Sequence, residues 1–300
     1  MNRSRMMFVG AAFVLTFAVS APAQTQSATS GDWTPELLSD GQPNITGMWN
    51  NSRAIFTPLE LPEELAGKQL SSEELQARAE ARGQGRIASS EWRGHEDSRG
   101  VGGYGFYWFD WYWETPDDIG QPALIVDPPS GRIPERTANA RESVSMNLAE
   151  LHDAAENMES GDRCISRGVL GMMMPTEYNN GTLILQSPGY VVILSEMIHE
   201  VRVVPLDGRP TLPVAVRQWM GDSRGWWDGD TLVVESQNYT AKTGSFYTIV
   251  STYGSGATLR LVERFTRVAD GTLMYEVTVE DENAWDVPWT YRIPMVKNTM

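Results

Sequence analysis

Three residues in the C-terminal half of the chain have side chains suited to acid–base chemistry, namely Tyr178, His199 and Arg264. A histidine titrates near neutral pH and can give or take a proton, while a guanidinium can hold a carbonyl or carboxylate oxygen. We predict these three as catalytic residues, with Asn179 and Asn180 completing the polar wall of a ligand site. Whether they meet depends on the strands that carry them.

The predicted position of His199 follows from the segment between Tyr190 and Val204, whose composition is typical of a β-strand. Every second residue from Val191 to Val203 is apolar except Ser195 and His199, so a continuous strand would turn His199 into a core or cavity. Three interpretations stay open: a hydrogen-bonded core histidine, a general acid or base, and a zinc ligand. Glu196 is a candidate ligand-binding residue, but residues three apart on a strand face opposite ways, so it is not expected to share a metal with His199.

The predicted orientation of Arg264 follows from a hairpin around Asp270-Gly271. A two-residue turn there pairs Arg264 with Val277 and puts Tyr275, a candidate ligand-binding residue, on the same side of the sheet. This side is the more apolar one and is expected to face inward, where an arginine needs a carboxylate partner or a ligand oxygen. A three-residue loop would instead turn Arg264 outward.

An aromatic run from Tyr104 to Trp113 contains eight aromatic side chains in ten residues. They cannot all point into a core from one strand or loop, so some are expected to line a pocket or to stack on a sugar or an aromatic ligand. We assign Tyr107, Trp108 and Trp111 as ligand-binding candidates.

Several other chemistries are disfavoured by the residue spacing. The Gly221–Gly225 segment matches G-x-S-x-G, but a further strand follows it and all three histidines precede Ser223, so we interpret it as a turn. Cys164, the single cysteine, is interpreted as a buried structural thiol and not as a nucleophile. No phosphate loop, dinucleotide fingerprint or metal-ligand spacing occurs, so neither a cofactor nor a metal is expected.

From Gly181 onward, runs rich in Val, Ile, Leu, Thr and Tyr alternate with turn signals, which predicts an antiparallel meander of about seven strands. The signals are Asn180-Gly181, Pro188-Gly189, Asp207-Gly208, Asp228-Gly229 and Asp270-Gly271. The predicted fold is therefore mainly β, a lipocalin-like barrel or a sandwich, with one or two short helices in the N-terminal half.

The N-terminal half carries the expected helices. Ser71 and Glu74 form a capping box within a helical pattern from Leu59 to Arg82, and Arg141 to Met158 could be a second helix. Gly83 to Gly103 is expected to be a loop, and Ile45 to Trp49 and Ala123 to Val126 are expected to be strands. We predict one β-rich domain over residues 44–300, with a helical and aromatic insertion at about 59–158, after a flexible lead-in at 24–43.

The first 23 residues have the order of a secretory signal peptide: Arg3 and Arg5, an apolar run from Met6 to Val19, and small residues before a cleavage site. The protein is thus expected to be exported, to the periplasm or beyond. Cleavage removes two arginines and no acid, so the net charge moves from −15 to −17. A chain this acidic is not expected to bind nucleic acid or, once cleaved, a membrane; the expected partner is a small molecule.

These motifs together resemble a large family of uncharacterised exported proteins of Gram-negative bacteria. The resemblance covers most of the mature chain and rests on LIVDPPSGRIP at Leu124–Pro134, the EMIH segment within Gln186–Asp207, and GDSRGWWDGDTLVVE at Gly221–Glu235. Two features depart from the family pattern: Trp111-Tyr112-Trp113 replaces a basic residue, and a C-terminal tail with a Cys-His pair is missing. A weaker similarity, Gly47-x-Trp49 before a meander, implies a lipocalin-like barrel whose ligand enters at the open mouth.

Three functions remain open from the sequence, and the first is preferred because polar residues at inward strand positions usually have a task. The first is a cofactor-independent lyase, isomerase or hydrolase acting on a small aromatic or sugar-derived molecule, which requires His199 and Arg264 to reach one cavity. The second is a non-catalytic binding protein for a glycan or a lipophilic ligand, and a structural envelope protein is a third possibility.

Overall fold

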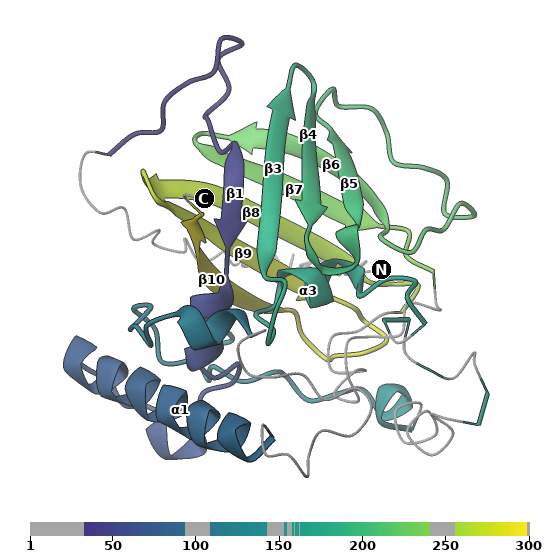
Figure 1. Cartoon of the computed structure of the whole chain (residues 1–300). Helices are drawn as coiled ribbons and strands as arrows, with labels where there is room; N and C mark the ends of the chain where they lie inside the picture. Colours follow the sequence, from purple (N-terminus) through teal and green to yellow (C-terminus); the bar gives the residue numbers. More distant parts are fainter. Residues whose placement is uncertain are drawn as a thin grey trace, which may run out of the picture. The chain divides into compact units, whose positions relative to one another are not determined.

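A computed structural model of the chain describes residues 33–93, 109–142, 153–154, 158, 160–161, 163–240 and 256–298. Within Trp33–Met300, ten strands form one antiparallel sheet that curls into a nearly closed barrel (Figure 1). The strand order is β5-β4-β3-β1-β10-β9-β8-β7-β6, with β2 paired to β10 beside this path. The predicted mainly β fold, with few helices, is confirmed.

The strands follow the meander predicted from the sequence. The bounds are β1 Gly47–Asn50, β2 Ile125–Asp127, β3 Gly181–Ser187, β4 Tyr190–Ser195, β5 Val201–Pro205, β6 Asp222–Asp228, β7 Thr231–Gln237, β8 Arg260–Ala269, β9 Thr272–Glu280 and β10 Trp289–Lys297. Along β8 and β9 every second residue is buried, which is the pattern of strands with one face on a core. The barrel is filled by large side chains such as Trp49, Phe265, Tyr275, Trp289 and Tyr291.

The turn signals have mixed outcomes. Gly189, in the β3–β4 hairpin, and Gly229, in the β6–β7 hairpin, take the predicted left-handed backbone, with φ of 79° and 60°. The expected turn at Asn180-Gly181 is wrong, because Gly181 already belongs to β3 and Asn179 takes the left-handed conformation instead, with φ of 59°.

The β8–β9 hairpin corrects the predicted orientation of Arg264. Its connection is the expected two-residue turn, Asp270-Gly271, but a bulge at Val268 shifts the register of β8 by one residue. Because side chains alternate along a strand, this shift turns all of β8 over. Arg264 pairs with Glu276, lies on the outer face and forms an ion pair with exposed Asp228, Nη2 to Oδ2 at 2.7 Å. The predicted inward position of Arg264 is therefore wrong.

The segment from Tyr190 to Val204 is a hairpin and not one strand, which corrects the position of His199. β4 ends at Ser195, a single 3-10 turn covers Met197–His199, and β5 begins at Val201. His199 is exposed in this turn, so its predicted place in the core is wrong. The residues of the turn include no Gly, Pro, Asn or Asp, so the sequence gives no turn signal there.

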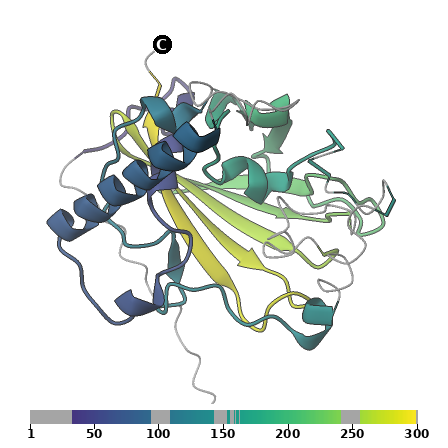
Figure 2. The ribbon, with the colours of Figure 1, turned by 60° about the horizontal axis from the view of Figure 1, so that its bottom comes forward.

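One long helix lies outside the sheet (Figure 2). This helix, α1 (Ser72–Arg93), begins at the predicted capping box: Ser71 N–H donates to Glu74 Oε2 at 2.8 Å, and Glu74 N–H donates to Ser71 Oγ at 3.2 Å. It continues through Gly83, where a loop was predicted. A Cβ on Gly83 would lie 2.5 Å from Pro116 Cγ, so glycine is used here for close packing.

The described chain also contains the shorter helices η1 Ser52–Phe56, η2 Glu63–Leu65, η5 Asp110–Trp113, α3 Gly168–Met173 and η7 Met197–His199, and residues 138–142 are helical as well. No helix in the described ranges is long and apolar enough to span a membrane. The signal peptide and most of the predicted second helix, 141–158, lie outside the described residues.

Candidate functional site

Part of the predicted ligand site comes together as a packed cluster beside α1. Trp111, Phe109 and Tyr178 stack in sequence, with ring centroids 5.6 Å and 6.4 Å apart. Trp111 Nε1 donates to Glu177 Oε2 at 2.5 Å. Trp111 is buried and Tyr178 packs against the same apolar cluster, so these rings build the contact between α1 and the barrel.

The two predicted asparagines serve the same packing. Asn180 is 3% exposed, and both its backbone N–H and its Nδ2 donate to Asp110 Oδ2, at 2.9 Å and 2.8 Å. Asn179 supplies the left-handed residue that leads into β3. The predicted aromatic residues Tyr107 and Trp108 lie outside the described residues.

The barrel interior holds a charged cluster that the sequence analysis did not single out. Arg202 of β5 and Glu263 of β8 pair through two hydrogen bonds of 2.6 Å and 2.8 Å, and their side chains are 3% and 0% exposed. Tyr275 OH donates to Glu263 Oε1 at 3.1 Å, so this predicted ligand-binding residue is engaged within the core. Burial alone would lower the pKa of Arg202, but the charge of Glu263 and its hydrogen bonds outweigh burial and raise it.

Glu196 and His199 border one pocket, which we call the outer-face pocket. It lies on the outside of β1, β3 and β4 and has a volume of about 540 Å³. It is lined by Met48, Gly181, Leu183, Leu194, Ser195, Glu196, His199 and Asn298. The two titratable side chains share this pocket because they lie in a turn, where the alternation of a strand does not apply. The expectation that Glu196 and His199 point to opposite faces is therefore wrong.

The turn that presents these side chains has an unusual backbone. Ile198 and His199 both take left-handed conformations, with φ of 60° and 45°. Each such residue costs roughly 1–2 kcal/mol relative to a right-handed one, and a β-branched side chain is rare there. Burial of Met197 in the core, at 6% exposure, helps to hold the turn in place. Strain of this kind is concentrated at functional sites.

Gly181 positions the carboxylate of Glu196. Its backbone N–H donates to Glu196 Oε2 at 3.0 Å. A Cβ on Gly181 would lie 2.6 Å from the same oxygen, so only glycine lets the carboxylate lie against β3. The backbone of Gly181 is not left-handed, so the turn predicted at Asn180-Gly181 does not explain why glycine is used here.

The pocket opens onto a wider apolar surface on the same face of the sheet. Leu183 pairs with Met48 on one side and Leu194 on the other, and Leu194 pairs with Val201. Met48, Leu185, Val201 and Val203 are 40%, 46%, 52% and 57% exposed. Apolar side chains this exposed and this close together are typical of a surface that binds a partner or a ligand.

In the described part of the chain, no three His, Cys, Asp or Glu side chains converge on a metal position. Cys164 is exposed, so the predicted burial of its thiol is wrong. Comparison with protein-family models gave no match, and comparison with curated proteins gave none either. The resemblance to exported proteins of Gram-negative bacteria therefore stays a prediction.

Proposed function

We propose that this is an exported, non-catalytic binding protein for a small lipophilic molecule that carries a positively charged or hydrogen-bond-donating end, and that it binds this molecule in the outer-face pocket. The observation that carries the proposal is a pocket of about 540 Å³ with apolar walls, into which one strained turn presents Glu196 and His199. Small-molecule sites commonly have roughly this size, with a few polar groups on an apolar lining.

The apolar part of the ligand is expected to lie against Met48, Leu183 and Leu194. These side chains follow one another across β1, β3 and β4, so they offer one continuous wall. Covering such a wall removes apolar surface from water, which contributes about 25 cal/mol for each Å².

The polar end of the ligand is expected to meet Glu196. The lining includes no Lys or Arg, and the carboxylate has no ion-pair partner among the described residues. Gly181 N–H occupies Oε2 and leaves Oε1 to accept from a ligand. The net charge of −15, or −17 after cleavage, adds a long-range attraction for cations.

Binding is favoured over catalysis by where the predicted acid–base groups lie. Arg264 of β8 does not line the pocket of His199, and it is paired with Asp228 of β6. Glu196 and His199 are both exposed to water, whereas proton-transfer sites are usually closed off from it.

The proposal is tested by calorimetric titration of the purified protein with decylamine and with decanol. We expect decylamine to bind more tightly than decanol, and Glu196→Gln, which can still accept from Gly181 N–H, to weaken decylamine binding about tenfold. Glu282→Gln removes an exposed carboxylate elsewhere and serves as the control. Equal binding of both ligands to the wild type and to Glu196→Gln would rule out a role for the carboxylate. The proposed function would be rejected if neither decylamine nor decanol bound the wild-type protein.

A further inference from the structure

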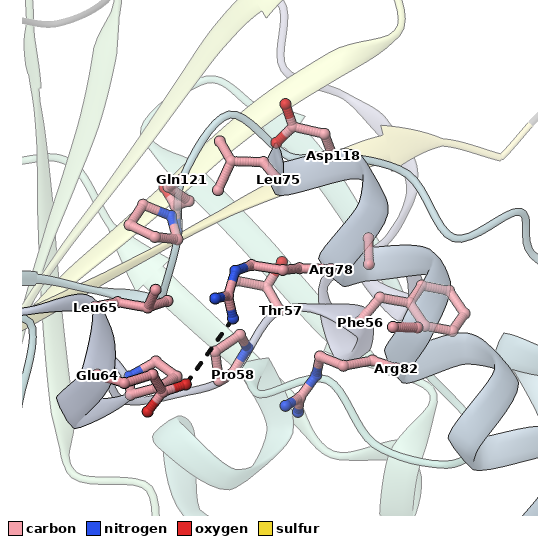
Figure 3. A pocket seen from close by; sticks show the side chains of 14 residues that line it. Phe56, Thr57, Pro58, Glu64, Leu65, Leu75, Arg78, Arg82, Asp118 and Gln121 are labelled. Carbon is pink, nitrogen blue, oxygen red and sulfur yellow. Dashed lines mark ion pairs between the residues drawn. The ribbon is translucent and has the colours of Figure 1, made fainter. Parts of the chain in front are cut away.

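A second pocket lies away from the outer-face pocket, between α1, η2 and the segment that follows η5 (Figure 3). Its volume is about 330 Å³. Phe56, Leu65 and Leu75 form apolar walls together with three prolines, Pro58, Pro62 and Pro122. The helix contributes two arginines, Arg78 and Arg82, and Figure 3 shows both guanidinium groups extending from α1 toward the space in front of η2.

The two arginines are four residues apart, so they lie on the same face of the helix and repel one another. Arg78 has a weak ion-pair partner, Glu64, with Nη1 and Oε1 4.0 Å apart and both side chains substantially exposed, and its charge also acts on Glu74. Arg86, one turn further on, is engaged by Glu177 at 3.2 Å and lies over the Trp111 ring. Arg78 and Arg86, the outer two of these three arginines on α1, therefore each have a negatively charged partner.

Arg82, which lies between Arg78 and Arg86 on α1, makes no hydrogen bond or ion pair with any residue that the structure describes. Arg82 is exposed as a whole residue. The pKa of its guanidinium is lowered, first because the pocket walls partly shield it from water and then because of the charge of Arg86. Both causes would be offset by an anion, which would supply the missing countercharge and accept hydrogen bonds from the planar fork.

The acids that border the pocket do not fill this role. Glu64 faces Arg78, and Asp118 Oδ1 accepts from Gly120 N–H at 2.6 Å within its own loop. The positive charge that has no ion-pair partner among the described residues is thus that of Arg82, and it shares the pocket with Phe56 and other apolar side chains.

We infer that this pocket is a binding site for an amphipathic carboxylate, whose carboxylate is held by Arg82 with Arg78 beside it and whose apolar body lies against Phe56, Leu65 and Leu75. Such a ligand is a fatty acid of medium length or an aromatic acid. The site prefers the opposite charge from the outer-face pocket and does not depend on the function proposed for that pocket.

The test is a calorimetric titration of the full chain with decanoate, with decanol as the uncharged analogue. We expect Arg82→Gln to weaken decanoate binding at least tenfold, because the side chain keeps most of its length but loses its charge. Lys68→Gln removes a nearby positive charge outside the pocket and should change binding less than twofold. Decanol should bind the wild type and Arg82→Gln equally.

Arg82→Lys provides a second variant, and we expect an intermediate loss because the charge stays but the two-point fork is gone. Circular dichroism of each variant checks that α1 is intact. Unchanged decanoate binding in Arg82→Gln would overturn the inference, as would equal losses in Arg82→Gln and Lys68→Gln, which would indicate general charge attraction. Loss of decylamine binding in Glu196→Gln without loss of decanoate binding would show that the two pockets are separate.

Discussion

Arg202 of β5, at one edge of the sheet, and Glu263 of β8, two strands in from the other edge, form a buried two-point ion pair, with distances of 2.6 Å and 2.8 Å. β5 and β6 end the sheet, and no described residue of β5 pairs with β6. The ion pair therefore crosses a seam that main-chain hydrogen bonds do not close. Loss of either partner would destabilise the fold, because the remaining charge would be buried without compensation.

The first prediction concerns this pair. Arg202→Met leaves the Glu263 carboxylate buried with Tyr275 as its one hydrogen-bond partner among the described residues, and it should destabilise the fold by about 3–5 kcal/mol. Arg264→Gln, which breaks the exposed pair with Asp228, should cost at most about 1 kcal/mol. Urea unfolding of both variants measures the difference, and equal costs would show that burial does not decide the strength of these pairs.

The second prediction concerns packing at the seam. A Cβ on Gly225 of β6 would lie 2.8 Å from Val204 Cγ1 and 2.7 Å from Leu206 Cδ2, so β5 and β6 approach closely at this point. Gly225→Ala should therefore destabilise the protein by roughly 1–3 kcal/mol through overpacking. Gly208→Ala replaces a glycine with open space around it, and its cost should come from its positive φ of 71° alone. Thermal unfolding compares the two. An unchanged melting temperature for Gly225→Ala would mean that the seam can widen freely.

How far the sequence predicted this molecule depends on the local signal at each element. The capping box placed the start of α1 because Ser71 and Glu74 satisfy each other's backbone groups locally. The β8–β9 turn was also predicted, yet one bulge at Val268 reversed which face of β8 is buried. The sequence gives no turn signal for such a bulge. The side chain of Arg267, next to it, points inward and donates to Asp270 O at 2.6 Å and, far along the chain, to Asn44 O at 3.0 Å.

The candidate site was predicted only in part. Glu196 and His199 were selected for their chemistry, and both do border a pocket. Their shared position was missed because a turn with two left-handed residues, Ile198 and His199, looks like a strand in the sequence. Arg82 was missed because an arginine on a polar helix is ordinary, and only its lack of a partner in three dimensions makes it notable.

The third prediction concerns pH. Burial raises the pKa of the Glu200 carboxyl, although a hydrogen bond with Ser166 and the charge of Arg202 oppose the shift. The folded protein therefore binds a proton on the Glu200 carboxyl more tightly than the unfolded chain does, in which the pKa of a glutamate is about 4.3. The stability that this proton contributes is present below that pH and is lost as the pH rises through the raised folded value.

Glu200→Gln should accordingly be more stable than the wild type near pH 7, by at most about 1 kcal/mol because the side chain is only half-buried, and the advantage should vanish near pH 4. Glu282→Gln, on the exposed surface, should show no such trend. Urea unfolding across this pH range gives the comparison. A constant difference between Glu200→Gln and the wild type at every pH would contradict the assigned shift.

The fourth prediction separates the position of the Glu196 carboxylate from its charge. In Gly181→Ala the new methyl group would lie 2.6 Å from Glu196 Oε2, at the flexible end of that side chain, so the carboxylate should move while the fold is kept. We expect decylamine binding to fall at least fivefold, with a melting temperature within a few degrees of the wild type because only a side-chain end is displaced. Gly271→Ala, which has open space around the glycine, is the matched control. If Gly181→Ala binds decylamine as the wild type does, the contact between Gly181 and Glu196 does not position the ligand, and the polar end must be recognised elsewhere in the pocket.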